Sequence, residues 1–191
     1  MSKKISVVVD MQKDFIDGCL GSPEAIQIVD SVEAKIKAAA SDGNVIIFTR
    51  DTHGEDYLDT EEGKNLPVPH CIKDTDGWQI NDRLLAAAGS DPIIVNKETF
   101  GSRDLGQMIA DILANDKDIE AVELFGLCTD ICVISNALLV KAFNPNIPIY
   151  VDATCSAGVT PDSHDTALAA MDSCQINITG EGEEPWRKKA N

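Results

Sequence analysis

The sequence predicts an α/β fold: a three-layer αβα sandwich around a central, mainly parallel six-stranded sheet. Two observations support this prediction. Short, almost uninterrupted apolar runs alternate with stretches of helical periodicity from end to end. These runs lack the polar–apolar alternation of half-exposed strands, so they indicate strands that helices cover on both faces, as in parallel sheets. We expect one domain over residues 1–191, with a loose charged tail at about 181–191.

The predicted strands and helices alternate in order along the chain. The apolar runs that form strands are Ile5–Val9, Val45–Thr49, Ile93–Val95, Ala121–Phe125, Ile149–Val151 and Gln175–Thr179. Ser22 followed by Pro23 marks the start of the first long helix, and Gly43 ends it. The other helical patterns are Ile80–Ala88, Leu105–Leu113, Ile131–Ala142 and Pro161–Met171. Residues 52–77 form a long polar loop, and such a loop in a compact domain suggests function.

Composition disfavours several classes of protein. The net charge of −16 disfavours binding to nucleic acid or to an anionic membrane, because both require a basic surface. No apolar run approaches the roughly 20 residues of a membrane-spanning helix, and the N-terminus lacks a signal-peptide core. We expect a cytoplasmic homo-oligomer that acts on a small molecule, with its six cysteines as free thiols.

Polar residues follow the carboxyl ends of four predicted strands. They are Asp10, Asp51, Lys97 and the segment Thr129–Cys132. Open α/β sheets bind ligands at this edge, so four distant stretches of sequence are expected to meet in one crevice. The alternative is that they are ordinary polar caps and solvated loop charges.

Cys132 is the candidate nucleophile. It lies in the first turn of a predicted helix, where the helix dipole lowers a thiol pKa and backbone N–H groups can stabilise an oxyanion. Asp10 could accept the thiol proton, and Lys97 would hold the pair together. A buried core cysteine and a surface lysine remain alternatives. A redox couple between Cys128 and Cys132 is a further alternative.

The long loop carries a possible metal site. Asp51, His53 and His70 lie in or beside it, together with Glu61 and Glu62. Carboxylate and imidazole ligands suit Zn, Fe or Mn with positions open to water or substrate. Two unrelated loop histidines are the alternative. The third histidine, His164, stands in the first turn of the last helix, and we interpret it as structural.

Five segments together resemble a known family. VVVDMQKDFIDG, FTRDTH, LPVPHC, NKETFGS and GLCTDICV occur in the order found in the isochorismatase-like cysteine hydrolases. The resemblance covers almost the whole chain and is strongest to the nicotinamidase and pyrazinamidase branch. It implies amide hydrolysis to the acid and ammonia through a thioester, with Asp10 as general base, Lys97 as triad lysine and Cys132 as nucleophile.

The resemblance also implies how substrate and metal are bound. Asp51, His53 and His70 match the metal ligands of nicotinamidases, and Glu62 is preferred over Glu61 as the fourth ligand. The ion, Zn or alternatively Fe or Mn, would bind the pyridine nitrogen and so orient the amide.

Two further features follow from the resemblance. A non-proline cis peptide is implied at Leu127–Cys128, which makes the backbone N–H groups of Cys128 and Cys132 the oxyanion hole. Phe15 matches the aromatic residue that packs on the pyridine ring.

Three other interpretations remain. A haloacid-dehalogenase-type phosphatase also uses an aspartate after the first strand, but it needs a second acid where this chain has Gln12. Another isochorismatase-like hydrolase would act on a different small amide or an enol ether. A signalling or scaffold module of doubly wound fold is the alternative that is not an enzyme. We interpret the chain as a nicotinamidase-type hydrolase.

Overall fold

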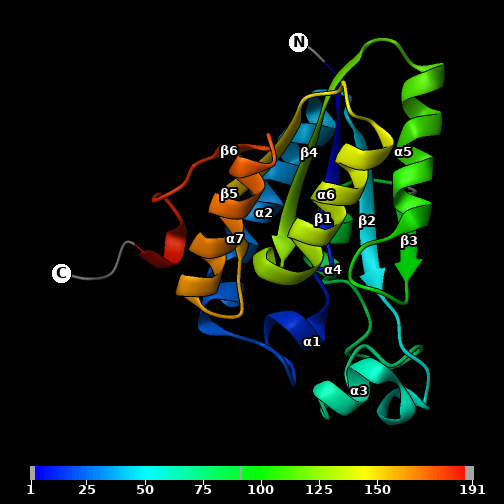
Figure 1. The fold of residues 1–191 in the computed structure, drawn as a ribbon, viewed down its shortest axis with the longest axis vertical. Coiled ribbons are helices and arrows are strands. Elements are labelled where there is room, and N and C mark those ends of the chain that lie inside the picture. The colour runs from blue at the N-terminus through cyan, green and yellow to red at the C-terminus, as the bar shows by residue number, and fades with distance from the viewer. Residues whose placement is uncertain (1–2, 91, 188–191) are drawn as a thin grey trace.

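A six-stranded sheet with helices on both faces forms the framework of the computed structural model, which describes residues 3–90 and 92–187 (Figure 1). The strands are β1 Lys3–Val9, β2 Val45–Asp51, β3 Ile93–Lys97, β4 Ile119–Leu127, β5 Ile149–Ala157 and β6 Asn177–Thr179. Their order is β3-β2-β1-β4-β5-β6, and every neighbouring pair is parallel. The predicted fold class is therefore confirmed.

Most of the helices form the two outer layers, and two short ones, α1 Lys13–Ile16 and α3 Glu61–Asn65, lie at the carboxyl edge of the sheet (Figure 1). The others are α2 Pro23–Ser41, α4 Asp82–Ala87, α5 Arg103–Asn115, α6 Ile134–Phe143 and α7 Pro161–Ser173. In Figure 1, α5, α6 and α7 lie in front of the sheet and α2 lies behind it. Each layer has its own apolar core against the sheet. Among the described residues, no helix combines the length and apolar character needed to cross a membrane.

Helix α2 forms where the sequence predicts it, and its capping residues and buried face explain why. Ser22 caps it by accepting a hydrogen bond from the Ala25 N–H at 3.0 Å, and Pro23 occupies the first turn. Its buried residues are Ala25, Ile28, Val29, Val32, Ile36 and Ala39. Each larger side chain contributes about 1.5–3 kcal/mol by burial. Gly43 follows the helix at a φ of 73°, a conformation that costs glycine little.

The strand order reverses between β1 and β4, and this switch point places the site. Ligands of doubly wound sheets bind outside the carboxyl ends of the strands at such a point. Gly126 lets the two strands meet there: a Cβ on it would lie 2.2 Å from the Val9 carbonyl oxygen. Its φ of 130° also disfavours any side chain. Asp10 and the segment after Leu127 therefore emerge side by side.

Several element boundaries differ from the prediction. The loop 52–77 contains a 3₁₀ turn, Tyr57–Asp59, and the short helix α3, whose cap Thr60 accepts from the Gly63 N–H at 3.0 Å. Helix α1 was not predicted. Strand β5 continues to Ala157, although its polar residues interrupt the apolar pattern. One of these, Asp152, pairs with Lys35 of α2, so a polar residue in this strand is compensated by an ion pair.

The prediction of a loose tail is wrong for the segment up to Arg187. Glu184 is fully buried, and Trp186 packs against the apolar core beneath α2. The short turn Pro185–Arg187 ends the described chain. Residues 188–191, the rest of the predicted tail, lie outside the described residues. Partial burial of the apolar Trp186 ring accounts for the packing of this otherwise charged segment.

Candidate active site

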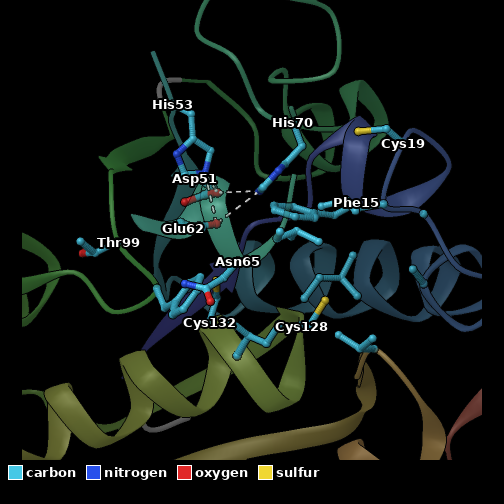
Figure 2. A pocket seen from close by; sticks show the side chains of 18 of the residues that line it. Phe15, Cys19, Asp51, His53, Glu62, Asn65, His70, Thr99, Cys128 and Cys132 are labelled. Carbon is cyan, nitrogen blue, oxygen red and sulfur yellow. Dashed lines mark ion pairs between the residues drawn. The ribbon is translucent and has the colours of Figure 1, made fainter. Parts of the chain in front are cut away.

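A cavity of about 1070 Å³ opens at the carboxyl edge of the sheet (Figure 2). Cys132 and Cys128 line one side of it, and Phe15 and His70 line the other. Asp51, from the end of β2, reaches the cavity floor. The four strand-end segments singled out by the sequence thus meet in one place.

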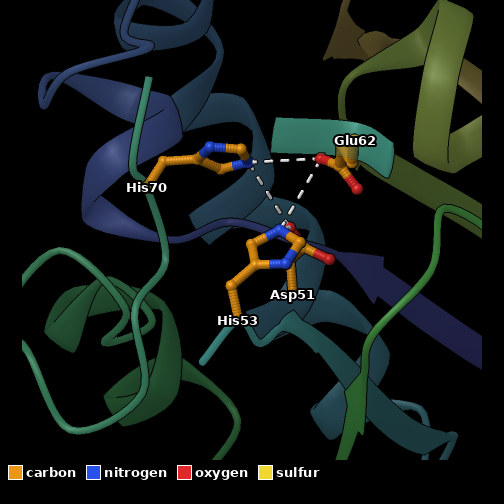
Figure 3. Close-up of side chains that lie close together, drawn as sticks. All are labelled: Asp51, His53, Glu62 and His70. Atoms are coloured by element: carbon orange, nitrogen blue, oxygen red, sulfur yellow. Dashed lines mark ion pairs between the residues drawn. The ribbon is translucent and has the colours of Figure 1, made fainter. Parts of the chain in front are cut away.

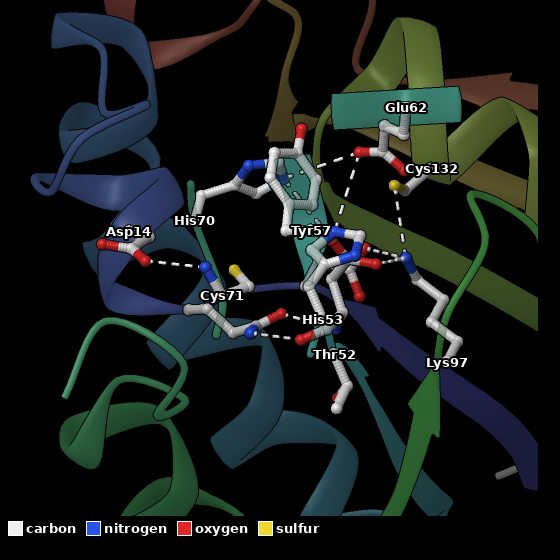
Figure 4. Close-up of polar contacts among 12 residues, drawn as sticks. Asp14, Thr52, His53, Tyr57, Glu62, His70, Cys71, Lys97 and Cys132 are labelled. Atoms are coloured by element: carbon white, nitrogen blue, oxygen red, sulfur yellow. Dashed lines mark hydrogen bonds and ion pairs between the residues drawn. The ribbon is translucent and has the colours of Figure 1, made fainter. Parts of the chain in front are cut away.

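Lys97 connects the polar residues beneath the cavity. Its Nζ lies 2.7 Å from Asp10 Oδ2, 3.0 Å from Asp51 Oδ1 and 3.4 Å from Cys132 Sγ (Figure 4). Asp51 and Lys97 are direct register partners in β2 and β3. All four side chains are buried, so these charges act with little solvent screening. Burial alone would lower the pKa of Lys97, but Asp10, Cys132 and Asp51 together raise it well above its usual value.

The surroundings of the Asp10 carboxyl suit it to accept and release a proton. Its Oδ1 accepts a hydrogen bond from the Thr49 hydroxyl at 2.6 Å, and its backbone has a left-handed φ of 47°. Among the described residues, Oδ2 has no hydrogen-bond partner of acceptable angle, although it forms the ion pair with Lys97. Burial raises the pKa of the carboxyl, while Lys97 opposes this shift. A carboxylate with a raised pKa is a stronger base.

The turn that carries Cys132 is a π-helical turn, Thr129–Val133, which runs into α6. The peptide bond Leu127–Cys128 before it is cis, as the resemblance implied. Turns of this type occur often at functional sites. All six cysteines are free thiols, so no disulfide joins Cys128 to Cys132.

The expected lowering of the Cys132 pKa is wrong. Burial raises the pKa of this thiol well above its usual value, and the charge of Asp10 adds to that effect. Lys97 opposes both but does not outweigh them. A raised pKa favours the protonated thiol, so a nearby base is needed to make Cys132 a nucleophile.

Four side chains form a second cluster beside this group (Figure 3). Asp51, His53, Glu62 and His70 each present a ligand atom, and these atoms all lie within 4.8 Å of one another. His53 Nε2 is 2.8 Å from Asp51 Oδ2, and Glu62 Oε1 is 3.6 Å from Nε2 of each histidine. Helix α3 brings Glu62 into the cluster, whereas Glu61 lines the cavity outside it.

The ring nitrogens of the two histidines are arranged as in a metal site. His70 Nδ1 lies 2.8 Å from the Val68 carbonyl oxygen, which can only accept, so in the neutral ring the proton is on Nδ1 and Nε2 carries the lone pair. His53 Nε2 is buried and has no hydrogen-bond partner of acceptable geometry among the described residues. The donor set of two imidazoles and two carboxylates suits Zn, Fe or Mn.

Burial and the neighbouring charges shift the pKa values of the acidic groups in the cluster. Burial opposes ionisation of Asp51, yet His53 and Lys97 hold the pKa of its carboxyl below the usual range. Burial raises the pKa of Glu62. Tyr57 packs against both imidazole rings, with centroids 4.7 and 5.0 Å away, and thereby fixes their orientation. Phe15, from α1, lies beside the cluster at 5.4 Å from the His70 ring.

Several supporting residues were missed by the sequence reasoning. Gln12 is fully buried: its Oε1 accepts from the Asp51 N–H at 2.7 Å, and its Nε2 donates to the Asp51 carbonyl at 2.9 Å. Asn136 donates to the Cys132 carbonyl at 2.8 Å. The position of Gln12, two residues after Asp10, was the only signal available for it. Because this amide is fully engaged and is no acid, the structure does not support the phosphatase interpretation.

Comparison with known proteins identifies the class. A family model described as the isochorismatase domain matches residues 4–181. The structure is similar to that of the pyrazinamidase of Pyrococcus horikoshii in complex with zinc, with a TM-score of 0.77 and 28% identity over 93% of this chain and 98% of that one. It is also similar to the nicotinamidase/pyrazinamidase PncA of Bacillus subtilis, with a TM-score of 0.76 and 26% identity over 92% and 98%.

A curated relative agrees with these structures. The nicotinamidase of Escherichia coli (strain K12) is 24% identical, and the alignment covers 94% of each chain. The chain belongs to the isochorismatase family and is a hydrolase of that family. Its relatives with the names nicotinamidase and pyrazinamidase share only about a quarter of its residues.

Proposed function

We propose that the chain is an amide hydrolase of the nicotinamidase type, which converts nicotinamide or a similar small heteroaromatic amide to the acid and ammonia. One observation carries the proposal. A buried lysine lies 3.4 Å from the Cys132 sulfur and 2.7 Å from Asp10, beneath the cavity that the four-ligand cluster also lines. The names of the relatives support the same substrate class.

The first half of the reaction forms a thioester. Asp10 takes the proton of the Cys132 thiol, and the thiolate attacks the amide carbon. The backbone N–H groups of Cys128 and Cys132 donate to the developing oxyanion. Asp10 then returns its proton to the nitrogen, and ammonia leaves. Lys97 keeps these buried negative charges compensated throughout.

The second half regenerates the thiol. Asp10 removes a proton from water, and the hydroxide adds to the thioester carbon. The tetrahedral intermediate expels the Cys132 sulfur, which recovers its proton from Asp10, and the carboxylic acid is released. One carboxyl thus acts as base and acid in both halves, and its Oδ2, which pairs with Lys97 but has no hydrogen-bond partner among the described residues, is suited to this.

Asp51, His53, Glu62 and His70 would hold one divalent ion, Zn or alternatively Fe or Mn. When bound, such an ion supplies a Lewis acid that orients the ring nitrogen of the substrate. Phe15 packs against the ring, and burial of a side chain of this size contributes about 1–3 kcal/mol. Because Asp51, His53 and His70 match the metal ligands of nicotinamidases, this cluster favours a nicotinamidase over another hydrolase of the family.

Ammonia release from nicotinamide tests the activity, with benzamide as the matched substrate. Benzamide keeps the shape, the scissile amide and the Phe15 contact, but it has no ring nitrogen to face the cluster. We expect benzamide to be hydrolysed about a hundredfold less efficiently, or about 2.7 kcal/mol by the usual rate arithmetic. Equal efficiency, or no ammonia from either amide while another small amide is hydrolysed, would favour a different substrate class.

A further inference from the structure

A chain of hydrogen bonds runs from the nucleophile turn to the C-terminal segment. The Thr129 hydroxyl lies 2.8 Å from His164 Nδ1, and His164 Nε2 lies 3.3 Å from Glu184 Oε1. All three residues are fully buried. Thr129 opens the π-helical turn of Cys132, His164 stands on α7, and Glu184 belongs to the segment after β6.

The direction of these hydrogen bonds follows from the chemistry of the groups. Burial lowers the pKa of His164, so the imidazole is neutral and carries one N–H. The Glu184 carboxylate accepts that N–H from Nε2, and it accepts a second hydrogen bond from the Gly182 N–H at 3.2 Å. His164 Nδ1 therefore keeps its lone pair, and the Thr129 hydroxyl donates to it.

Further contacts around this chain of bonds anchor the C-terminal segment. The Arg187 guanidinium pairs with both Glu184 and Asp165, and the Trp186 ring stands edge-on to His164 at 5.2 Å. Glu184 and Arg187 lie beyond residue 181, where the match to the family domain ends. This support for the turn thus comes from a part of the chain outside the matched domain.

The residues just before α7 also contact the π-helical turn. The Val159 N–H donates to Asp130 Oδ1 at 3.0 Å, and Asp130 is the neighbour of Thr129. Gly158 packs so closely on His164 that a Cβ would come within 3.0 Å of its backbone. Gly158 and Val159 also line the cavity together with Cys132. Movement of His164 would therefore shift both the turn and the cavity wall.

A metal ion is not the better explanation of this cluster. His164, Asp165 and Glu184 have the chemistry of ligands and lie close together. However, the Arg187 guanidinium already supplies the positive charge that pairs with both carboxylates. Both ring nitrogens of His164 are also engaged.

We propose that His164 is a positioning residue for Cys132: Glu184 fixes its tautomer, and its Nδ1 holds the hydroxyl of Thr129 and thereby the turn that presents the nucleophile. This inference rests on the proposed function only in taking Cys132 as the nucleophile. It assigns the C-terminal segment a part in the reaction. A purely structural role would require only that the segment stabilise the fold.

Two variants remove the two ends of the chain of bonds. Thr129→Val keeps the shape of the side chain and removes its O–H, and Glu184→Leu removes the acceptor of Nε2–H. Thr129→Ser is the conservative variant that retains the hydroxyl. Glu183→Gln, at an exposed position next to Glu184, is the matched control. Each protein is assayed for kcat and KM below its unfolding transition, and the double variant Thr129→Val, Glu184→Leu is included.

Each single change is expected to lower kcat about tenfold with KM altered less than about twofold, the scale of a misplaced catalytic group. The double variant should be no worse than the poorer single one, because both act through His164. Thr129→Ser and Glu183→Gln should have the same kcat and KM as the unaltered chain. Loss of thermal stability with unchanged kcat, or effects that multiply in the double variant, would overturn the proposal.

A second readout does not depend on the substrate. The rate at which iodoacetamide alkylates Cys132, followed by peptide mass spectrometry, reports how the thiol is placed against its base. It should fall about tenfold in the same two variants. If nicotinamide proves not to be a substrate, the proposed function fails, while these rates still decide the inference. Rates equal to or above that of the unaltered chain would contradict it.

Discussion

Asp10→Asn is the sharpest test of the proposed chemistry, because it removes the proposed base and keeps the size of the side chain and its hydrogen bond to Thr49. The amide oxygen can still accept the hydrogen bond that the Thr49 hydroxyl gives to Oδ1 at 2.6 Å. Lys97 keeps Asp51 at 3.0 Å, so its buried ammonium is not left without a counter-charge. The substitution removes the proton acceptor at the second oxygen and, with it, the ion pair that Lys97 forms with Oδ2 at 2.7 Å.

The expected loss follows from the state of the thiol. Burial raises the pKa of Cys132 well above its usual value, so without a base almost no thiolate forms near neutral pH. General bases contribute about 10²–10⁴-fold. A loss of at least about 10³-fold in kcat/KM, or about 4 kcal/mol, is expected for a base used in both half-reactions. Unfolding free energy should change by less than about 3 kcal/mol, the cost of removing a sole buried partner.

The assay is ammonia release together with metal content and thermal unfolding. Asp42→Asn makes the same chemical change at an exposed position behind α2 and should leave all three measurements unchanged. If Asp10→Asn keeps kcat/KM within tenfold of the unaltered chain while the fold is intact, Asp10 is not the base. The thiolate would then have to form by another route, and the reasoning about burial would be refuted.

Three further outcomes are expected. Cys132→Ala should abolish turnover while Cys128→Ala is much milder, since only the Cys128 backbone is needed; kinetics of both variants with intact folds check this. Elemental analysis should find one divalent ion per chain, and a His53→Ala, His70→Ala double variant should lose it; equal metal content would show that these histidines are not ligands. Because burial lowers the pKa of His164 below about 6.5, the unfolded chain takes up the proton first as pH falls, so stability should decline below that pH. His164→Asn should flatten this decline in thermal unfolding measured against pH.

The catalytic residues were predictable because their positions follow from a repeating pattern. Asp10, Asp51 and Lys97 each come at the end of an apolar run, and the carboxyl ends of parallel strands share one edge. No knowledge of side-chain packing was needed to bring them together. The register adds the finer detail that Asp51 lies directly opposite Lys97.

Glu62 could be chosen over Glu61 from the sequence only by resemblance. In the structure the choice depends on α3, a helix of five residues that is too short to leave a clear periodic signal. Thr60 caps it, and the buried Tyr57 holds the preceding turn. These contacts are tertiary, so a reading of local pattern assigns the segment to a loop.

The pKa of Cys132 and the packing of the tail were both predicted wrongly, because burial is not visible in the local sequence. Position at a helix start predicts a lowered thiol pKa, but burial acts in the opposite direction and is stronger here. The tail was interpreted as loose because of its charged composition. Its buried carboxylate, Glu184, is nevertheless compensated by Arg187 three residues later, a pairing that composition does not show.

Asp51 explains why the two halves of the site must be considered together. One of its oxygens accepts from Lys97 at 3.0 Å, and the other lies 2.8 Å from His53. The residue thus belongs both to the charge network around the nucleophile and to the metal-ligand cluster. A change at Asp51 would remove a counter-charge from Lys97 and a ligand from the cluster at once. Loss of activity in such a variant cannot be assigned to either role, and for this reason the histidines and Asp10 are the residues to alter first.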